Sequence, residues 1–152
     1  MQLKEGDTAP AFSAVDQDGK KVTLKDLIKK GRVILYFYPK DNTPGCTTEA
    51  CDFRDRKADL ATKGATVVGV SPDGEASHRK FREQFALPFT LLADPDHAVA
   101  AAYGVWGEKK NYGKTYEGLI RSTFVIEPNG KIAKALYNVK ATGHVESVLA
   151  SL

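Results

Sequence analysis

Apolar positions along the chain alternate between unbroken runs, typical of buried strands, and a spacing of three to four residues, typical of helices. Val33–Tyr38 is a continuous apolar, β-branched and aromatic run that ends at Pro39, which predicts a strand buried on both faces. Thr66–Val70 predicts a second strand of the same kind. Between them, from about Pro44 to Lys63, apolar side chains recur at helical spacing and predict one long helix.

Turn residues divide the rest of the chain into shorter elements. Near the N-terminus, Ala11–Val15 and Lys21–Leu24 flank an Asp-Gln-Asp-Gly turn and predict a β-hairpin. Asp94 and Pro95 predict the N-cap and first position of a helix that runs through Tyr103. The other predicted elements are helices over Asp26–Lys30, Gly74–Phe85 and Gly143–Leu152, strands over Thr90–Ala93, Ser122–Ile126 and Lys131–Tyr137, and a loop over Val105–Gly118.

This order of elements indicates an α/β fold in which helices flank a central mixed sheet. Strands alternate with helices along most of the chain, and a late hairpin around Pro128-Asn129-Gly130 adds antiparallel strands. The sequence has no repeat, linker or low-complexity segment, so residues 1–152 are expected to form a single domain. Cys46 is predicted at the start of the helix that follows a central strand, and in this the order of elements resembles the thioredoxin-like architecture.

The composition is that of an ordinary globular protein, with 42% hydrophobic and 27% charged residues. The net charge of +3 arises from charges that alternate in sign along the chain, which argues against a nucleic-acid-binding surface. The longest apolar run is far too short to span a bilayer, so we expect no membrane association. The first residues lack the apolar stretch of a secretory signal, so we expect a cytoplasmic protein with reducible thiols.

The only two cysteines, Cys46 and Cys51, follow the first buried strand and a Thr-Pro-Gly turn. With Thr43 as the N-cap, Pro44 and Gly45 take the first two helical positions, and Cys46 takes the third. We expect the Thr43 hydroxyl to accept from a backbone N–H of the first turn, and Gly45 to let another molecule approach the backbone. Unpaired N–H groups and the positive end of the helix dipole favour the nucleophilic thiolate at Cys46.

Cys51 lies five residues after Cys46, where an intact helix keeps the two sulfur atoms apart. Their Cα atoms would be roughly 8.6 Å apart, beyond the ~7 Å limit for a disulfide. A disulfide therefore requires the start of the helix to unwind, and oxidation should remodel residues 44–55. The spacing allows a cycle in which the Cys46 thiolate attacks an oxidant, becomes a sulfenic acid and condenses with Cys51. Two inert, buried cysteines are the alternative.

The sequence predicts no metal site and no organic cofactor. The histidines, His78, His97 and His144, have no metal-ligand spacing with the cysteines or with one another, and we interpret them as structural or solvated. Arg121 begins an otherwise apolar strand. It is either a cation near Cys46 or a strand-end side chain that reaches toward water.

Pro39, Thr43 and Cys46 match Pro-x-x-x-Thr-x-x-Cys, the active-site pattern of the peroxiredoxin family. Tyr36–Thr47 and Tyr112–Ile126 resemble the bacterioferritin-comigratory (Q-type) subfamily almost residue for residue, and the resemblance extends over the whole chain. It implies a thiol-dependent peroxidase with a thioredoxin-like fold. The implied site consists of Cys46 as the peroxidatic cysteine, Cys51 as the resolving cysteine, Thr43 as a hydrogen-bonding partner of the peroxide and thiolate, Pro39 as a shield against water, and Arg121 as the catalytic arginine.

The resemblance also implies substrates and partners. Hydrogen peroxide and alkyl hydroperoxides are the implied substrates, and thioredoxin, or glutaredoxin, is the implied reductant. The chain has no third cysteine, so we expect an intrachain Cys46–Cys51 disulfide, or resolution by an external thiol, in a monomer. Glu49 matches a residue common in the subfamily, but a Glu there also complements the helix dipole, so its role stays open.

Two other functions remain open from the sequence. A non-enzymatic redox sensor or redox-regulated chaperone would use the same cysteine switch, and a binding module could use the same scaffold without the combined Thr43, Cys46 and Arg121. The predicted loop allows two interpretations. It is solvated with a few aromatic anchors, or its Val105–Tyr116 segment docks a partner or lines the substrate pocket.

Overall fold

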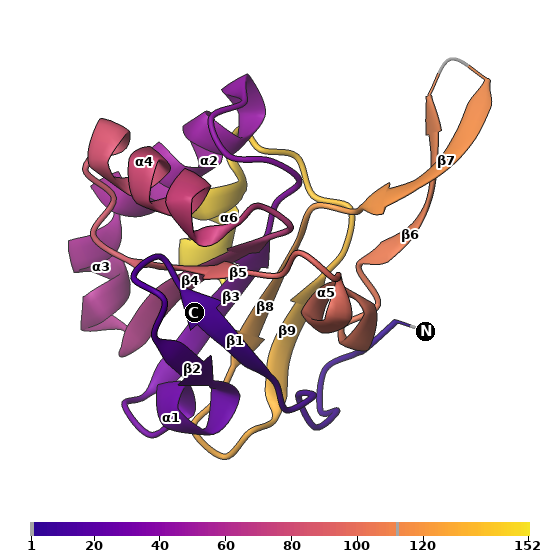
Figure 1. Ribbon diagram of the computed structural model, residues 1–152. Coiled ribbons are helices and arrows are strands. Elements are labelled where there is room, and N and C mark those ends of the chain that lie inside the picture. Colours follow the sequence, from indigo (N-terminus) through magenta and orange to yellow (C-terminus); the bar gives the residue numbers. More distant parts are fainter. Residues whose placement is uncertain (1, 112) are drawn as a thin grey trace.

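The computed structural model describes residues 2–111 and 113–152, and its centre is a seven-stranded mixed sheet with helices on both faces (Figure 1). The strand order is β2-β1-β5-β4-β3-β8-β9. The parallel centre of the sheet consists of β3 (Arg32–Phe37), β4 (Ala65–Ser71) and β5 (Thr90–Ala93). Antiparallel strands extend it on both sides, β1 (Ser13–Asp16) and β2 (Lys21–Thr23) beyond β5, and β8 (Ser122–Ile126) and β9 (Ile132–Leu136) beyond β3.

Two hydrophobic layers lie on opposite faces of this sheet, and the Val33–Tyr38 segment supplies both because its side chains alternate. All six of these residues have no exposed surface, which confirms the prediction of a strand buried on both faces. One layer is covered by α1 (Leu24–Ile28) and α5 (Ala98–Ala102). The other is covered by α2 (Pro44–Asp55), α3 (Lys57–Thr62), α4 (Glu75–Phe85) and α6 (His144–Ala150).

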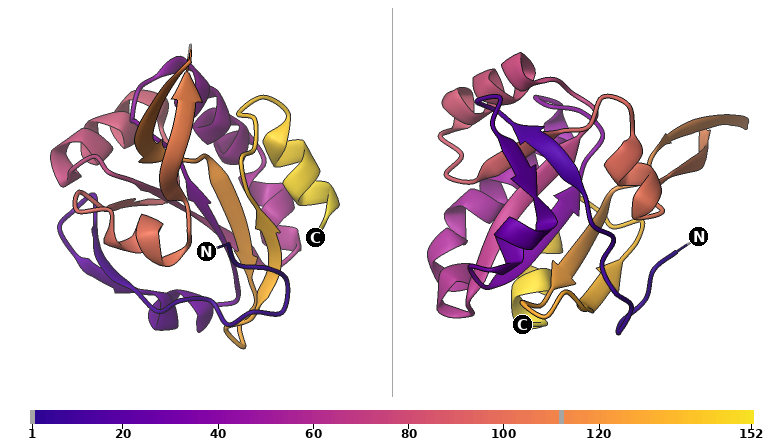
Figure 2. Two further views of the ribbon diagram at one scale, coloured as in Figure 1. Left: turned by 90° about the vertical axis from the view of Figure 1, so that its right-hand side faces the viewer. Right: turned by 60° about the horizontal axis from the view of Figure 1, so that its bottom comes forward.

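The segment predicted as a loop over Val105–Gly118 is instead mainly a β-hairpin. β6 (Trp106–Asn111) pairs antiparallel with β7 (Lys114–Leu119) in a separate two-stranded sheet that projects from the body (Figures 1 and 2). The loop prediction was wrong because the side chains of β7 from Lys114 to Glu117 are exposed on both faces, and such a strand lacks the apolar alternation from which strands are recognised. Tyr112 of the Val105–Tyr116 segment lies outside the described residues, as do the side chains of Lys109 and Lys110, so the prediction that they dock a partner or line a pocket stays untested there.

Two helix predictions also need correction. The long helix is two helices, because Arg56 leaves helical geometry, with φ −105° and ψ 10°, between α2 and α3. The helix predicted to start at Asp94 starts at Ala98, after a turn that ends with His97 in the left-handed region. Asp94 still caps it from outside, since its carboxylate accepts from the N–H groups of Val99 and Ala100. Within the described part of the chain, no helix is long and apolar enough to cross a membrane.

Candidate active site

Cys46 lies in the first turn of α2, directly after the loop that leaves the central strand β3. Thr43 is the N-cap and Pro44 the first helical residue, as predicted. Cys46 is 1% exposed and Cys51 is partly buried, and both are free thiols on one continuous helix. The intact helix therefore holds the two cysteines unpaired in this conformation.

The Thr43 hydroxyl does not cap the helix, contrary to the expectation from sequence. It donates to the carbonyl oxygen of Lys40 at 2.9 Å and makes no cap hydrogen bond. The turn is responsible, because Asn42 in the left-handed region, with φ 61°, lies between Lys40 and Thr43 and folds the chain back on itself. The first-turn N–H groups are thus left without a side-chain cap, and the oxygen of Thr43 keeps its capacity to accept a hydrogen bond.

Arg121 lies beside Cys46 and does not point to solvent. It immediately precedes β8, which pairs with β3 so that Ser122 faces Phe37, and this places Arg121 where β3 ends and the chain leads into α2. Its Nη2 donates to the Cys46 sulfur at 3.3 Å, and its side chain is 16% exposed. The first of the two interpretations of Arg121, a cation near the thiol, therefore holds.

Gly45 makes room for this arginine. A Cβ atom added at Gly45 would lie 3.3 Å from Nη2 of Arg121 and 3.6 Å from the Cβ of Ala141. The sequence suggested that the missing side chain allows close approach to the backbone at this position, and the group that approaches is the Arg121 guanidinium.

Glu49 holds the other side of the same guanidinium. Arg121 Nη1 donates to Glu49 Oε1 at 2.5 Å, and Glu49 has no exposed surface. Burial raises the pKa of Glu49 to about 7, although the charge and hydrogen bond of Arg121 oppose this shift. Burial by itself would lower the pKa of Arg121, but Glu49 and Cys46 outweigh it and raise that pKa, so the guanidinium stays charged. The site is a charged arginine between a buried carboxyl group and a buried thiol.

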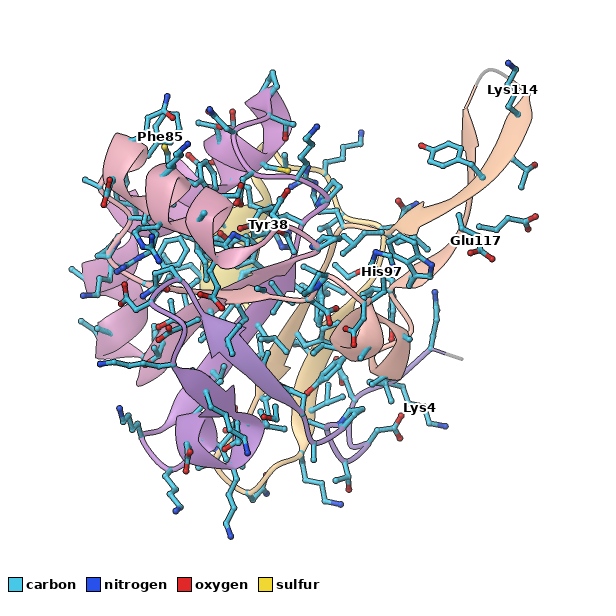
Figure 3. All side chains as sticks on the ribbon, in the orientation of Figure 1. Lys4, Tyr38, Phe85, His97, Lys114 and Glu117 are labelled. Atoms are coloured by element: carbon cyan, nitrogen blue, oxygen red, sulfur yellow. The ribbon has the colours of Figure 1, made fainter. Side chains whose placement is uncertain are left out.

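The histidines take structural positions. His144 Nε2 lies 2.7 Å from Thr123 Oγ1, and burial, followed by the charge of Arg121, lowers the pKa of His144 to about 4. It is therefore neutral at neutral pH. His97 stacks on Trp106 at the base of the projecting hairpin, on which Lys114 and Glu117 lie well away from the body (Figure 3). Among the described residues, no group of three or more His, Cys, Asp or Glu side chains could hold a metal ion.

Pro39 is partly exposed and lies on the loop between β3 and α2 that also carries Thr43. A cavity of about 310 Å³ lies elsewhere, and none of its lining residues is a predicted site residue. It is lined by Lys57, Leu60, Ala61, Ala65, Thr66, Val67, Pro88, Phe89 and Thr90. This cavity is therefore separate from the predicted site at the start of α2.

Known proteins with similar sequences were found along almost the whole chain. The model of the AhpC/TSA family matches residues 5–135. A putative peroxiredoxin of Mycobacterium tuberculosis, MT2597, is 55% identical over 144 residues, which cover 95% of this chain and 91% of the relative. Peroxiredoxin Bcp of Bacillus subtilis is 47% identical over 153 residues, which cover 100% of this chain and 96% of the relative.

Solved structures with the same fold come from the same group of proteins. The crystal structure of peroxidoxin BcpB from Mycobacterium tuberculosis superimposes with a TM-score of 0.88 at 36% identity, covering 99% of this chain and 96% of the other. The bacterioferritin comigratory protein of Xanthomonas campestris, studied for its alkyl peroxide reduction activity, gives a TM-score of 0.86 at 38% identity, covering 92% and 88%. These matches confirm the predicted thioredoxin-like architecture.

Proposed function

This chain belongs to the AhpC/TSA family and is a thiol-dependent peroxidase, a peroxiredoxin of the bacterioferritin-comigratory type, and on that premise we propose which of its residues perform the reaction. Cys46 is the peroxidatic cysteine and Cys51 the resolving cysteine. The observation that supports this most strongly is the contact of the Arg121 guanidinium with the Cys46 sulfur at the start of a helix that also carries the second free thiol.

In the first step the Cys46 thiolate attacks one peroxide oxygen. The S–O bond forms as the O–O bond breaks, sulfur is oxidised to a sulfenic acid, and the leaving oxygen takes a proton to become water or an alcohol. Arg121 stabilises the negative charge as it moves from sulfur to oxygen. The Thr43 hydroxyl, whose hydrogen is engaged by Lys40, accepts a hydrogen bond from the peroxide, and Pro39 limits the access of water.

In the second step the Cys51 thiol attacks the sulfenic sulfur. A disulfide forms between Cys46 and Cys51, and the sulfenic oxygen leaves as water. Because five residues on an intact helix separate the two thiols, the start of α2 must unwind for this step. An external dithiol then reduces the disulfide, returns both cysteines to thiols and is itself oxidised.

We further propose the finer assignments that the residues favour. Hydrogen peroxide and alkyl hydroperoxides are the substrates, thioredoxin is the reductant with glutaredoxin as a substitute, and the enzyme acts in the cytoplasm. All the proposed catalytic groups come from one chain, so the enzyme works as a monomer. The sensor and chaperone alternatives are not favoured, because the similar proteins are named as peroxiredoxins.

A coupled assay tests this function. Consumption of NADPH is followed with thioredoxin, thioredoxin reductase and hydrogen peroxide, for wild type, Cys46→Ser and Cys51→Ser. We expect turnover in wild type, none in Cys46→Ser, and turnover in Cys51→Ser only when a small thiol is added. Turnover that survives Cys46→Ser would overturn the assignment of the peroxidatic cysteine. Loss of two thiols in wild type without catalytic turnover would favour a sensor over a peroxidase.

A further inference from the structure

Asp41 forms a buried polar cluster that the reaction described above does not use. It lies on the loop between β3 and α2, and its side chain is 3% exposed. Its Oδ1 accepts from the Tyr38 hydroxyl at 2.6 Å. Its Oδ2 accepts from the Ser77 hydroxyl at 2.8 Å and lies 2.6 Å from Nδ1 of His78. Both carboxylate oxygens are therefore satisfied, by partners that include two residues of α4.

The contacts of His78 show that this cluster holds one shared proton. His78 has no exposed surface, and its Nε2 lies 2.9 Å from the carbonyl oxygen of Leu92, which can only accept, so Nε2 carries a hydrogen. The short Nδ1–Oδ2 contact to Asp41 also needs a hydrogen between the two atoms. This hydrogen can be assigned to either His78 or Asp41. In both cases, the hydrogen bond between the two side chains exists only while this hydrogen is present.

The backbone of the same loop is fixed as well. The N–H of Asp41 donates to Asp73 Oδ2 at 2.7 Å, and this oxygen also accepts from the hydroxyl of Ser71 at the end of β4, at 2.9 Å. Asp41 is thus tied to β4, to α4 and, through His78, to β5. Removing one partner of such a buried network leaves the other polar groups without a hydrogen bond, which costs free energy. The groups of the network therefore hold one another in place.

We propose that Asp41 and His78 are positioning residues for peroxide reduction, because their buried pair fixes the Pro39–Thr43 loop against α4 and keeps it in place while α2 unwinds. The proposal rests on the function proposed above, since this loop carries Pro39 and Thr43. Neither Asp41 nor His78 touches the reacting atoms, and both act through the loop.

A second anchor lies on the far side of the two cysteines. Phe53 has no exposed surface, and its ring packs on Tyr36 with ring centroids 4.6 Å apart. Asp41 before Cys46 and Phe53 after Cys51 therefore delimit the part of α2 that unwinds. The peroxide-binding loop survives each catalytic cycle and does not have to be rebuilt.

The test distinguishes an effect on the peroxide-binding loop from an effect on the reactivity of the Cys46 thiol. In a Cys51→Ser background, the oxidation of Cys46 by hydrogen peroxide is compared with its alkylation by iodoacetamide, a reagent that needs the thiolate but not a peroxide site. We expect Asp41→Asn to slow oxidation by about 10- to 100-fold, the size of effect expected from a slightly misplaced binding group, and to leave alkylation unchanged. Asp16→Asn is the matched control, since Asp16 as a whole residue is 8% exposed against 7% for Asp41, and its carboxylate accepts from the N–H groups of Asp18 and Lys20 in the β1–β2 turn. It should change neither rate.

Three results would overturn the proposal. Equal slowing of oxidation and alkylation by Asp41→Asn would place the effect on the thiolate or the fold, and no slowing would show that the loop does not depend on this pair. The third is measured in wild type and does not require the variant to fold. The amide of Asp41 should be equally protected from hydrogen exchange in the reduced and oxidised proteins, and its loss of protection on oxidation would contradict a persistent anchor. A parent protein whose Cys46 does not react with peroxide would instead overturn the proposed function itself.

Discussion

At the scale of single residues, the site depends on one guanidinium that serves two acceptors. Arg121 donates through Nη2 to Cys46 and through Nη1 to Glu49. A planar fork of donors can do this, whereas a lysine is a single point of charge. The sequence placed Arg121 at a strand end near the site, but it did not reveal that a buried carboxyl group aims this arginine at the thiol.

The first prediction concerns this fork. Arg121→Lys should lower kcat/KM for hydrogen peroxide by about 100-fold, because one ammonium group cannot contact the Cys46 sulfur and the Glu49 carboxyl group in the same geometry. Stopped-flow oxidation of the reduced protein measures this effect. A variant as fast as wild type would show that the charge alone, without the paired contacts, is sufficient.

The second prediction uses Gly45. Gly45→Ala adds a Cβ that would meet Arg121 Nη2 at 3.3 Å, so the guanidinium must shift away from Cys46. An alanine in a helix is also more favourable than a glycine, by roughly 0.5–1 kcal/mol. We therefore expect a protein that unfolds at equal or higher urea concentration yet reacts more slowly with peroxide. Slower reaction accompanied by clear destabilisation would point to general damage to the fold.

The third prediction is a pH dependence that arises from Glu49. The folded protein holds the Glu49 proton up to about pH 7, whereas the unfolded chain loses it near 4.5. The folded state binds more protons between these values, so this contribution to stability is complete below pH 4.5 and is lost as the pH rises through 7. It amounts to on the order of 3 kcal/mol. His144 acts in the opposite direction, because its pKa falls from 6.5 to about 4 on folding, and stability rises with pH between those values.

Comparing wild type with Glu49→Gln separates the two groups. The difference in the free energy of unfolding, from urea denaturation of the reduced proteins between pH 4 and 8, should change across the Glu49 window and be flat outside it. A pH-independent difference would mean that Glu49 is ionised throughout and that its burial is offset by Arg121.

At the scale of elements, α2 in the proposed mechanism both stabilises the thiolate and unwinds to form the disulfide. Its start exposes N–H groups to Cys46, and its intact turns keep Cys51 out of reach. A buried carboxyl group at Glu49, with Oε2 lacking a hydrogen-bond partner among the described residues, lowers the stability of these same turns. The free energy needed to unwind the helix is therefore lowered in the turns that the proposed disulfide requires to open.

The fourth prediction concerns this unwinding. Oxidation should increase the hydrogen-exchange rates of the amides from Thr47 to Cys51 by at least about tenfold, because those turns lose their i to i−4 bonds. The amide of Phe53 should change much less, since its ring is packed in the core. Exchange in the reduced and oxidised proteins, read by mass spectrometry after fragmentation, decides this. Equal protection of these turns in both forms would contradict the unwinding.

Elements with strong patterns were predictable from the sequence, and elements whose formation depends on tertiary contacts were not. The buried run Val33–Tyr38 and the helix start at Pro44 are determined by local residue types. Among the described side chains of the β6–β7 hairpin, those from Lys114 to Glu117 are all exposed and give no apolar alternation. The delayed start of α5 depends on the Asp94 carboxylate, which accepts hydrogen bonds across the intervening turn. Likewise, the Thr43 hydroxyl could either accept from a first-turn N–H group or donate to the carbonyl of Lys40. The turn at Asn42 favours the bond to Lys40, and the sequence pattern does not reveal this turn.

At the scale of the whole molecule, the proposed catalytic groups come from one chain, and the described surface exposes little apolar area. Among the described residues, Tyr116 is the sole large hydrophobic side chain that is exposed, at 46%. Obligate dimers bury larger apolar areas than that. The fifth prediction is therefore that sedimentation velocity gives the mass of one chain over a hundredfold range of concentration in both redox states. A dimer that persists on dilution would contradict this.

In the proposed mechanism, peroxide oxidises Cys46 and Cys51 of the same chain then forms a disulfide with it. The most direct measurement is the intact mass and peptide map of reduced protein after one equivalent of hydrogen peroxide, without a reductant. We expect the loss of two hydrogen atoms per chain and a single peptide linking Cys46 to Cys51, with a stable sulfenic acid at Cys46 in Cys51→Ser. A stable sulfenic acid in wild type, or a disulfide between two chains, would contradict it.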